Sequence, residues 1–502
     1  MKNIYFLLLF ITSFCFSQNS NLLDTSFGTN GVTNFAFYNG TDLLNGVQFK
    51  QADKLADGKI LVFGISQEGC HGSIVAQGGI VVRFTQNGIL DTTFNNGAGY
   101  KIFPNKYFLS FVKVDEYNYL VRSNNAIIDK LVLDENDINL ASNFTTYQPY
   151  NTLRDLSIGT DNKIYVLRNL NDGPNASITI VRLQADGTVD TTFGTNGGVN
   201  LGNTIKYGNI ILKENSIYLS GILSNASYAH IVVSKLHLDG TFDSNFGVNG
   251  TFQTTTNYYL YSDPKIFIHD DGIISGFFAK GNTPSGLFQF QLLANGTLNT
   301  SYNNNGIGLI SETGVYEENS NLTINKLDDD SLIVVGTINQ PESFNAVKFT
   351  SNGNLDTTFG TNGIIVSNEM SPNYPYTGSY PHYHGNALIY GESIVFVGMF
   401  WEWNCASTKY VSQLTKYVFN EAVLNNENFE HSNKVFIYPN PVQDVLFLSE
   451  ICNIEIFDLT GKILLKSENV SEINISNLST GVYFAKISSN KNEVSSFKFI
   501  KK

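Results

Sequence analysis

Aromatic side chains and histidines crowd into one stretch of the sequence, and both tryptophans of the chain follow shortly after it. Exposed rings beside amide and carboxylate groups suit stacking on sugar rings or a contact with another protein. The alternative is that the rings pack on one another and stabilise long loops. We predict a ligand-binding patch that consists of Trp401, Trp403, Tyr374, Tyr376, Tyr380, His382 and Tyr383.

Two histidines in this stretch also raise the question of a metal site. His382 and His384 could hold a metal ion with a third group such as Glu402 or His71, because imidazole and carboxylate are common ligands. Alternating histidines in a loop are more often ordinary surface residues. We therefore predict no metal site.

Two of the four cysteines stand at equivalent places in the chain. Cys70 and Cys405 lie six and seven residues beyond Gly64 and Gly398, which end two similar apolar segments. An oxidising compartment would favour their pairing. We predict a disulfide between Cys70 and Cys405, and we interpret Cys452 as a small core residue.

Sequence motifs of the common catalytic and cofactor sites are missing. The chain has no Gly-rich phosphate loop, no zinc-type Cys/His spacing and no nucleophile elbow, and we predict no cofactor. Its net charge of −13 argues against a nucleic acid as partner. We predict a non-catalytic module that binds a glycan or a protein. An extracellular enzyme that degrades polysaccharide or peptide is one alternative, and a structural surface protein is another.

The elements that position these residues must be short strands. The chain has 43 Gly, 37 Phe and 26 Tyr, and only 15% of its residues are charged. This composition suits strands and tight turns and disfavours long helices.

A motif of the form Leu-Asp-Thr-Thr-Phe-Gly-Thr-Asn-Gly recurs along most of the chain. The Asp and Thr side chains can cap a turn, and the Asn-Gly pair accepts positive φ. The aromatic residue would anchor the turn to the neighbouring layer. Calcium at the Asp residues is the alternative, but the spacing offers too few oxygen ligands. The copies centre on Phe27, Phe94, Phe144, Phe193, Phe246, Tyr302 and Phe359, at intervals of 49 to 67 residues, and the copy at Phe144 is worn.

Apolar, β-branched segments recur between the copies, such as Lys59 to Gly64 and Ile80 to Phe84. Each unit then holds four strands, named A to D from the inside outwards, and such a four-stranded sheet is a blade of a β-propeller. We predict seven blades, with six or eight as the alternative. The chain begins with an isolated D strand at 22–37 and ends its repeats with an A-B-C set at 386–419. The N-terminal strand should therefore close the last blade.

The motif copies and their strands resemble the Delta-60 β-propeller repeat of bacterial secreted proteins over roughly residues 22–420. The resemblance implies the propeller fold and no general activity. In a propeller the D–A and B–C loops emerge on one face. The aromatic stretch, the loop with both tryptophans and the loop with Cys70 are therefore predicted to converge over one sector.

The last seventy residues follow a different pattern. Alternation between turns is typical of a small antiparallel β-sandwich. Four ordered motifs closely resemble the type A C-terminal sorting domain of the type IX secretion system of Bacteroidota, which implies that the secretion machinery is a partner. An adhesive immunoglobulin-like module is the alternative. The residues that carry the resemblance are Tyr438, Pro439, Asn440, Pro441, Asp458, Gly461, Lys462, Gly481 and Tyr483, followed by a basic chain end.

The N-terminus has the layout of a secretory signal peptide. A positive residue, Lys2, precedes an apolar run at 4–12 and small residues before position 18. The run is too short to span a hydrocarbon core of roughly 30 Å, and no transmembrane segment is predicted. Lipidation at Cys15 is disfavoured by the bulky Phe14 before it.

We therefore predict an all-β protein that is secreted or at the cell surface and travels via the periplasm. Its predicted parts are a signal peptide at 1–18, a β-propeller at 19–420, a linker at 421–432 and a sorting domain at 433–502.

Overall fold

The computed structural model describes two compact units, one that ends at Glu421 and one that begins at Ala422. The described residues are 23–39, 42–68, 75–123, 126–148, 152–169, 177–225, 228–260, 263–281, 285–302, 304–311, 322–339, 342–367, 386–404, 407–418, 437–438, 442–458, 462–488 and 494–502.

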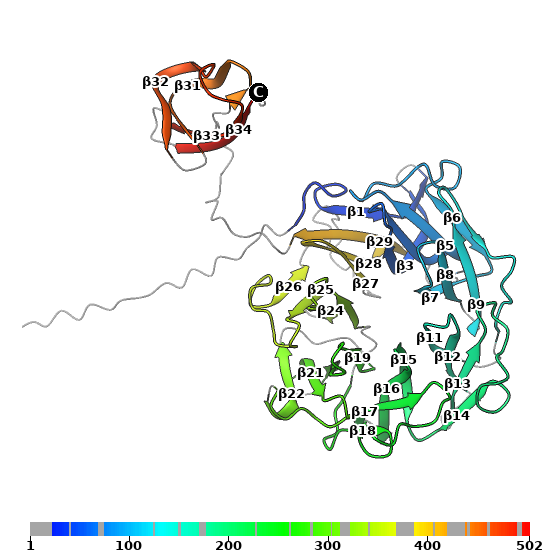
Figure 1. Cartoon of the computed structure of the whole chain (residues 1–502). Helices are drawn as coiled ribbons and strands as arrows, with labels where there is room; N and C mark the ends of the chain where they lie inside the picture. Colours follow the sequence, from blue (N-terminus) through cyan, green and yellow to red (C-terminus); the bar gives the residue numbers. More distant parts are fainter. Residues whose placement is uncertain are drawn as a thin grey trace, which may run out of the picture. The chain divides into compact units, whose positions relative to one another are not determined.

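The first unit is built from antiparallel sheets that follow one another around a centre (Figure 1). The first sheet holds β2 (Phe37–Asn39), β3 (Asp42–Lys54), β4 (Ile60–Glu68), β5 (Val75–Phe84) and β6 (Tyr100–Pro104). The second holds β7 (Phe108–Lys113), β8 (Asn118–Ser123), β9 (Ile128–Leu133) and β10 (Ile138–Leu140). The third holds β11 (Leu153–Ile158), β12 (Ile164–Asn169), β13 (Ile178–Leu183) and β14 (Gly198–Gly202).

The remaining sheets of this unit repeat the same order. The fourth holds β15 (Lys206–Lys213), β16 (Ser216–Asn225), β17 (Tyr228–His237) and β18 (Thr251–Gln253). The fifth holds β19 (Lys265–Ile268), β20 (Ile274–Lys280), β21 (Gly286–Leu292) and β22 (Ile307–Ser311), with the short 3-10 turn η2 (Asn304–Gly306) before β22. The sixth holds β23 (Thr323–Lys326), β24 (Leu332–Asn339), β25 (Glu342–Phe349) and β26 (Ile364–Ser367). The architecture is a β-propeller, as the repeats predict.

The last sheet of the ring joins the two ends of the first unit. It holds β27 (Asn386–Tyr390), β28 (Ser393–Asn404), β29 (Ser407–Val418) and, as its outer strand, β1 (Val32–Phe35). Val32 pairs with Thr415 and Phe35 with Ser412. This pairing confirms the prediction that the N-terminal strand closes the last sheet, and it covers the outer edge of β29 that would otherwise lie open.

Apolar side chains from neighbouring sheets fill the space between them. Between the first two sheets, for example, Phe63 of β4 packs on Phe111 of β7 with ring centroids 4.5 Å apart, and all atoms of Phe63 are buried. Alternate residues of a strand face opposite sides, so each blade can pack against both of its neighbours. The core of the ring is thus a series of interfaces between sheets.

The recurring aromatic residue fixes one sheet to the next at several places around the ring. Phe27 lies against Gly88 in the C–D turn of the first sheet, where a Cβ would come within 2.5 Å of the ring. The backbone N–H of Gly28 donates to the carbonyl of Asn87 in the same turn at 2.7 Å. The worn copy keeps this contact, because the ring of Phe144 lies against Gly187 of the third sheet.

A basic side chain in the C strand holds the Asp of the motif. The Arg83 Nε donates to Asp91 at 2.7 Å, and its Nη1 reaches the carbonyl of Glu135 in the next sheet. The fifth sheet replaces the ion pair with a neutral one, in which the Asn299 amide donates to Gln291 at 2.6 Å. The charged pairs are Arg83–Asp91, Arg182–Asp190, Lys235–Asp243, Lys348–Asp356 and Lys416–Asp24.

The second unit is also all-β. Its strands are β30 (Ile437–Tyr438), β31 (Val445–Phe457), β32 (Ile463–Asn474), β33 (Gly481–Ser488) and β34 (Val494–Lys501), in the order β30-β31-β33-β34 with β32 paired to β31. Tyr483 stacks on Phe499 and donates to the Ser479 carbonyl at 2.8 Å. Cys452 is buried in this core, as expected.

Candidate functional site

Most of the predicted ligand patch lies outside the described residues. This applies to Tyr374, Tyr376, Tyr380, His382 and Tyr383, and equally to the predicted disulfide partners Cys70 and Cys405. Among the sorting-motif residues, Pro439, Asn440, Pro441 and Gly461 also lie outside them.

The two tryptophans are described at the level of the backbone, and here the prediction of a loop is wrong. Strand β28 continues to Asn404 and pairs with β29 as far as Ser407, so Trp401 lies opposite Tyr410 and Trp403 opposite Thr408. Aromatic and β-branched residues favour extended backbone, which explains why the hairpin extends beyond the apolar segment. The apolar segment that ends at Gly398 had indicated a loop at both tryptophans.

A second hairpin extends in the same way in the neighbouring sheet. Strands β4 and β5 pair out to Glu68 and Val75, and Glu68 also pairs with Asn45 of β3. Strand β3 contacts both β28 and β29 of the last sheet. The two extended hairpins therefore belong to adjacent sheets and leave the ring at the same end, where the B strands end and the A strands begin.

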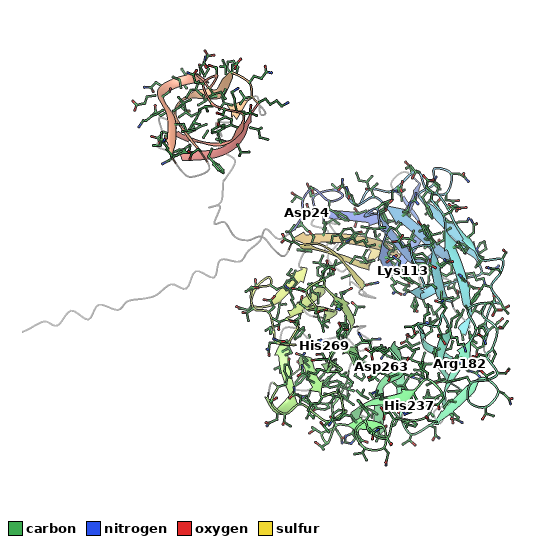
Figure 2. The ribbon with its side chains drawn as sticks, in the orientation of Figure 1. Asp24, Lys113, Arg182, His237, Asp263 and His269 are labelled. Atoms are coloured by element: carbon green, nitrogen blue, oxygen red, sulfur yellow. The ribbon has the colours of Figure 1, made fainter. Side chains whose placement is uncertain are left out.

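The inner strands of all the sheets in the ring enclose a central channel. It has a volume of about 1190 Å³ and is lined by residues of β3, β7, β11, β15, β19, β23 and β27. Figure 2 shows Lys113 and Asp263 beside the central opening, while Asp24 and Arg182 lie towards the outside. A cavity of this size can hold a ligand of several rings.

One polar residue from each inner strand forms a ring around the channel. Each member pairs with the B-strand residue at the same point of the ladder, for example Gln51 with Phe63 and Asp155 with Leu167. The members, called here the polar ring, are Gln51, Ser110, Asp155, Asn209, Lys265, Thr323 and Asn386.

Several members of the polar ring hydrogen-bond to the inner strand of the next sheet. The Gln51 side chain accepts from the N–H of Phe111 at 2.7 Å, and Asp155 accepts from the N–H of Ile210 at 3.0 Å. Each inner strand lies at an edge of its own sheet, so its free backbone N–H and C=O groups need hydrogen-bond partners from outside that sheet. Hydrogen bonds from the polar ring thus connect neighbouring blades around the channel.

The channel wall is more basic than the chain as a whole. Its lining includes Lys50, Lys113, Arg122, Arg154 and Lys265 against Asp53, Asp155 and Asp263, whereas the chain has 31 basic and 44 acidic residues. Lys113 contacts Asp53 at 2.7 Å, so these two charges largely offset each other.

Burial changes the acid–base behaviour of three groups in the wall. It lowers the pKa of Lys50 to about 8 and lowers the pKa of Arg122. Burial also raises the pKa of Asp155, although Lys265 and Arg122 oppose this effect. The wall therefore keeps its charges at a cost in solvation.

The bonding of Arg122 leaves part of its guanidinium free. Its Nη1 donates to the Arg154 carbonyl at 2.5 Å, but its buried Nε has no hydrogen-bond partner among the described residues. The same is true of two buried atoms in the wall of the sixth sheet, Thr323 Oγ1 and Asn325 Nδ2.

Sequence reasoning missed both the basic partners of the motif Asp residues and the channel wall. A signal for the first exists, because the basic residue of the C strand stands eight residues before the Asp in four units. The channel gives a weaker signal, since its residues differ from one inner strand to the next. Within the described part of the chain, no group of three His, Cys, Asp or Glu side chains could hold a metal ion.

Comparisons with known proteins identify both parts of the chain. Residues 436–502 match the secretion system C-terminal sorting domain, and residues 160–193 and 327–359 match a β-propeller domain of unknown function. The resemblances to a propeller repeat and to a sorting domain are thereby confirmed. The chain is a β-propeller protein with a C-terminal sorting domain. It is therefore a secreted or cell-surface protein, and the secretion machinery is a partner of its sorting domain.

Solved structures resemble this chain only distantly. The extracellular domain of a two-component system from B. thetaiotaomicron is 9% identical over 93% of this chain and 75% of its own, with a TM-score of 0.24. An endo-arabinase from Bacteroides thetaiotaomicron is 15% identical over 54% of this chain and 95% of its own, with a TM-score of 0.27. The C-terminal WD40 domain of Sif2 is 6% identical over 74% of this chain and 97% of its own, with a TM-score of 0.37. These values are too low to say what the chain binds.

No curated protein matches the chain. Among its described residues, no helix is long and apolar enough to cross a membrane.

Proposed function

We propose that the protein is a non-catalytic binding module, exported by the type IX route via the periplasm, that holds a glycan or protein at one end of a seven-bladed ring. The binding end is the one at which the β4–β5 and β28–β29 hairpins leave adjacent sheets. The observation that supports it most is the channel itself, because its wall holds buried donors that have no acceptor among the described residues. Unused buried donors indicate a place for a ligand or ordered water.

The finer organisation of the chain belongs to the same proposal. Residues 1–18 would be a signal peptide, 19–420 the propeller, 421–432 a linker and 433–502 the sorting domain. A β-sandwich for the sorting domain is supported by β31, whose first part pairs with β30 and whose second part pairs with β33. Such a strand can pass from one sheet to the other. Cys70 and Cys405 would join the two extended hairpins.

Glycan-array and pull-down binding of the purified protein tests the function. We expect Trp401→Ala and Trp403→Ala to weaken binding strongly, because aromatic anchors dominate such contacts. The matched control is Tyr117→Ala, which removes a 59% exposed ring from the A–B turn at the opposite end of the second sheet. Loss of binding in the control to the same extent, or no ligand at all for the folded protein, would contradict the proposal.

A further inference from the structure

The geometry points to a more specific ligand: we propose that the channel end beside the extended hairpins binds the carboxylate of an acidic saccharide. The site consists of Lys50, Arg122 and Arg154, called here the basic arc. This inference rests on the proposed function and names the class of glycan that would be bound.

The basic arc spans three consecutive sheets near one end of the channel. Lys50 in β3 and Arg154 in β11 occupy equivalent positions. Each residue is skipped in the pairing of its inner strand with the neighbouring B strand, because the register shifts there as in a β-bulge. Bulges often turn a side chain towards a functional site. Arg122 stands near the end of β8, between them, and donates to the carbonyl of Arg154.

The basic arc offers donors that an oxyanion could use. With Nη1 engaged, Arg122 keeps the edge formed by Nε and Nη2, and its buried Nε has no partner among the described residues. This edge of a guanidinium is suited to bidentate contact with a carboxylate. No hydrogen bond or ion pair joins the Lys50 ammonium to another described residue, so it could supply a second contact.

The charges in the wall favour an anion over a cation. Asp53, the carboxylate next to the arc on β3, is occupied by Lys113 at 2.7 Å and by the Tyr119 hydroxyl at 2.8 Å. Asp155 accepts the N–H of Ile210 and faces Lys265 as well as Arg122. The lining therefore carries a surplus of positive charge inside an acidic protein, and this field draws anions into the channel.

The opposite wall indicates that the ligand also carries hydroxyl groups. Thr323 Oγ1 and Asn325 Nδ2 are buried there without partners among the described residues, although both could bond to a hydroxyl. A buried polar atom that lacks a partner is costly, so a ligand that supplies one gains affinity. A sugar with a carboxylate satisfies both walls, and the channel volume of about 1190 Å³ leaves room for a short oligosaccharide.

Isothermal titration of the full chain with trigalacturonate tests the site, beside a neutral galactose oligosaccharide and a glutamate peptide of equal charge. We expect trigalacturonate to bind best, with an affinity that falls with added salt. Lys50→Gln and Arg122→Gln should each weaken its binding about tenfold or more. Lys213→Gln, which removes a lysine from the far end of the eight-residue inner strand β15, should leave it unchanged.

Each other outcome overturns a defined part of the argument. If both arc variants unfold like the wild type on heating and bind trigalacturonate equally well, the basic arc is not the site. If the glutamate peptide binds as tightly, the channel selects charge and not a saccharide. Equal binding of the neutral oligosaccharide would refute this inference and leave the proposed function intact. If none of the three probes binds, this inference is refuted, and the proposed function is refuted as well only if the glycan-array and pull-down experiments also find no ligand.

Discussion

The outer rim and the inner wall of the ring are built in opposite ways. At the rim, the same turn, aromatic anchor and Asp recur from sheet to sheet, and Phe27 and Phe246 face the same kind of turn glycine. At the inner wall, the polar ring carries a different side chain in almost every sheet, including one Asp and one Lys.

This difference separates what joins the blades from what distinguishes them. Each rim contact must fit the next blade, so the same geometry demands the same residues again and again. Inner-wall residues need only reach the next backbone or face the channel, which many polar side chains can do. A ligand in the channel would meet several sheets at once, and the variable positions there could then determine which ligand binds.

Opening the ring at its closure should have the largest effect. Deleting residues 19–36 removes β1 and the buried rings of Phe27 and Phe35, and it exposes the edge of β29. The expected loss is about 6–10 kcal/mol in the free energy of unfolding, from two buried aromatic residues alone. Chemical denaturation measures it. A synthetic peptide of residues 19–36 should restore stability in trans, and failure to do so would contradict the closure role of this strand.

Breaking one charged pair at the rim should cost less than the closure. Asp91→Asn leaves the Arg83 side chain, which is 3% exposed, without its carboxylate, and should destabilise the fold by about 3–5 kcal/mol. The double variant Arg83→Gln/Asp91→Asn copies the neutral Gln291–Asn299 pair of the fifth sheet. It should recover at least half of the loss in denaturant titrations. An additive double variant would mean that the pair is not coupled.

The acid side of the stability profile follows from the same pair. Burial alone would raise the pKa of Asp91, but hydrogen bonds from Thr93 and the charge of Arg83 outweigh it and lower the pKa. A lowered folded-state pKa stabilises the fold above the unfolded value of about 4 and loses this contribution as the pH falls below it. The deficit of Asp91→Asn should therefore shrink in acid.

A methyl group at one rim glycine separates packing from backbone strain. Gly88 has φ +75°, and a Cβ there would lie 2.5 Å from the Phe27 ring. Gly391 also has positive φ, at +54°, but nothing lies within 4 Å of its Cβ position. Gly88→Ala should cost about 2–4 kcal/mol and Gly391→Ala about 1 kcal/mol, measured by thermal unfolding. Equal losses would show that the rim contact between sheets contributes nothing.

The same contrast explains what the sequence could predict. Local turn chemistry repeats at the rim, so the blades, their strands and the closing strand followed from the motif. The worn copy of the motif did not hide the second blade. Phe144 still lies against Gly187, although the outer strand β10 comes before the motif in this blade. The predicted end of β28 was wrong because the strand continues to pair with β29 through Trp403. The length of a hairpin depends on its cross-strand partners, which the sequence of one strand does not show.

The channel could not be found from the sequence, for a physical reason. Lys50, Arg122 and Arg154 lie far apart in the chain and share no motif. They line one wall only because three consecutive sheets pack side by side around the channel and bulges shift two of the residues out of the ladder. A site that several sheets share leaves no spacing rule within any one repeat.

A small gain in stability is expected for the empty protein when Lys50 loses its charge. Burial lowers the folded-state pKa of Lys50 to about 8, so at neutral pH the fold bears the cost of a poorly solvated ammonium. Lys50→Met should raise the free energy of unfolding by about 1–2 kcal/mol at pH 7. The advantage should fade between pH 8 and the unfolded-state value near 10.5, because the wild type gains stability as its lysine deprotonates.

Lys113→Met is the control, since it breaks the pair with Asp53 and should destabilise the protein. With saturating trigalacturonate, the wild type should become more stable to unfolding than Lys50→Met, because a bound carboxylate stabilises the ammonium that is poorly solvated in the empty channel. If Lys50→Met stays the more stable protein, Lys50 does not contact the ligand.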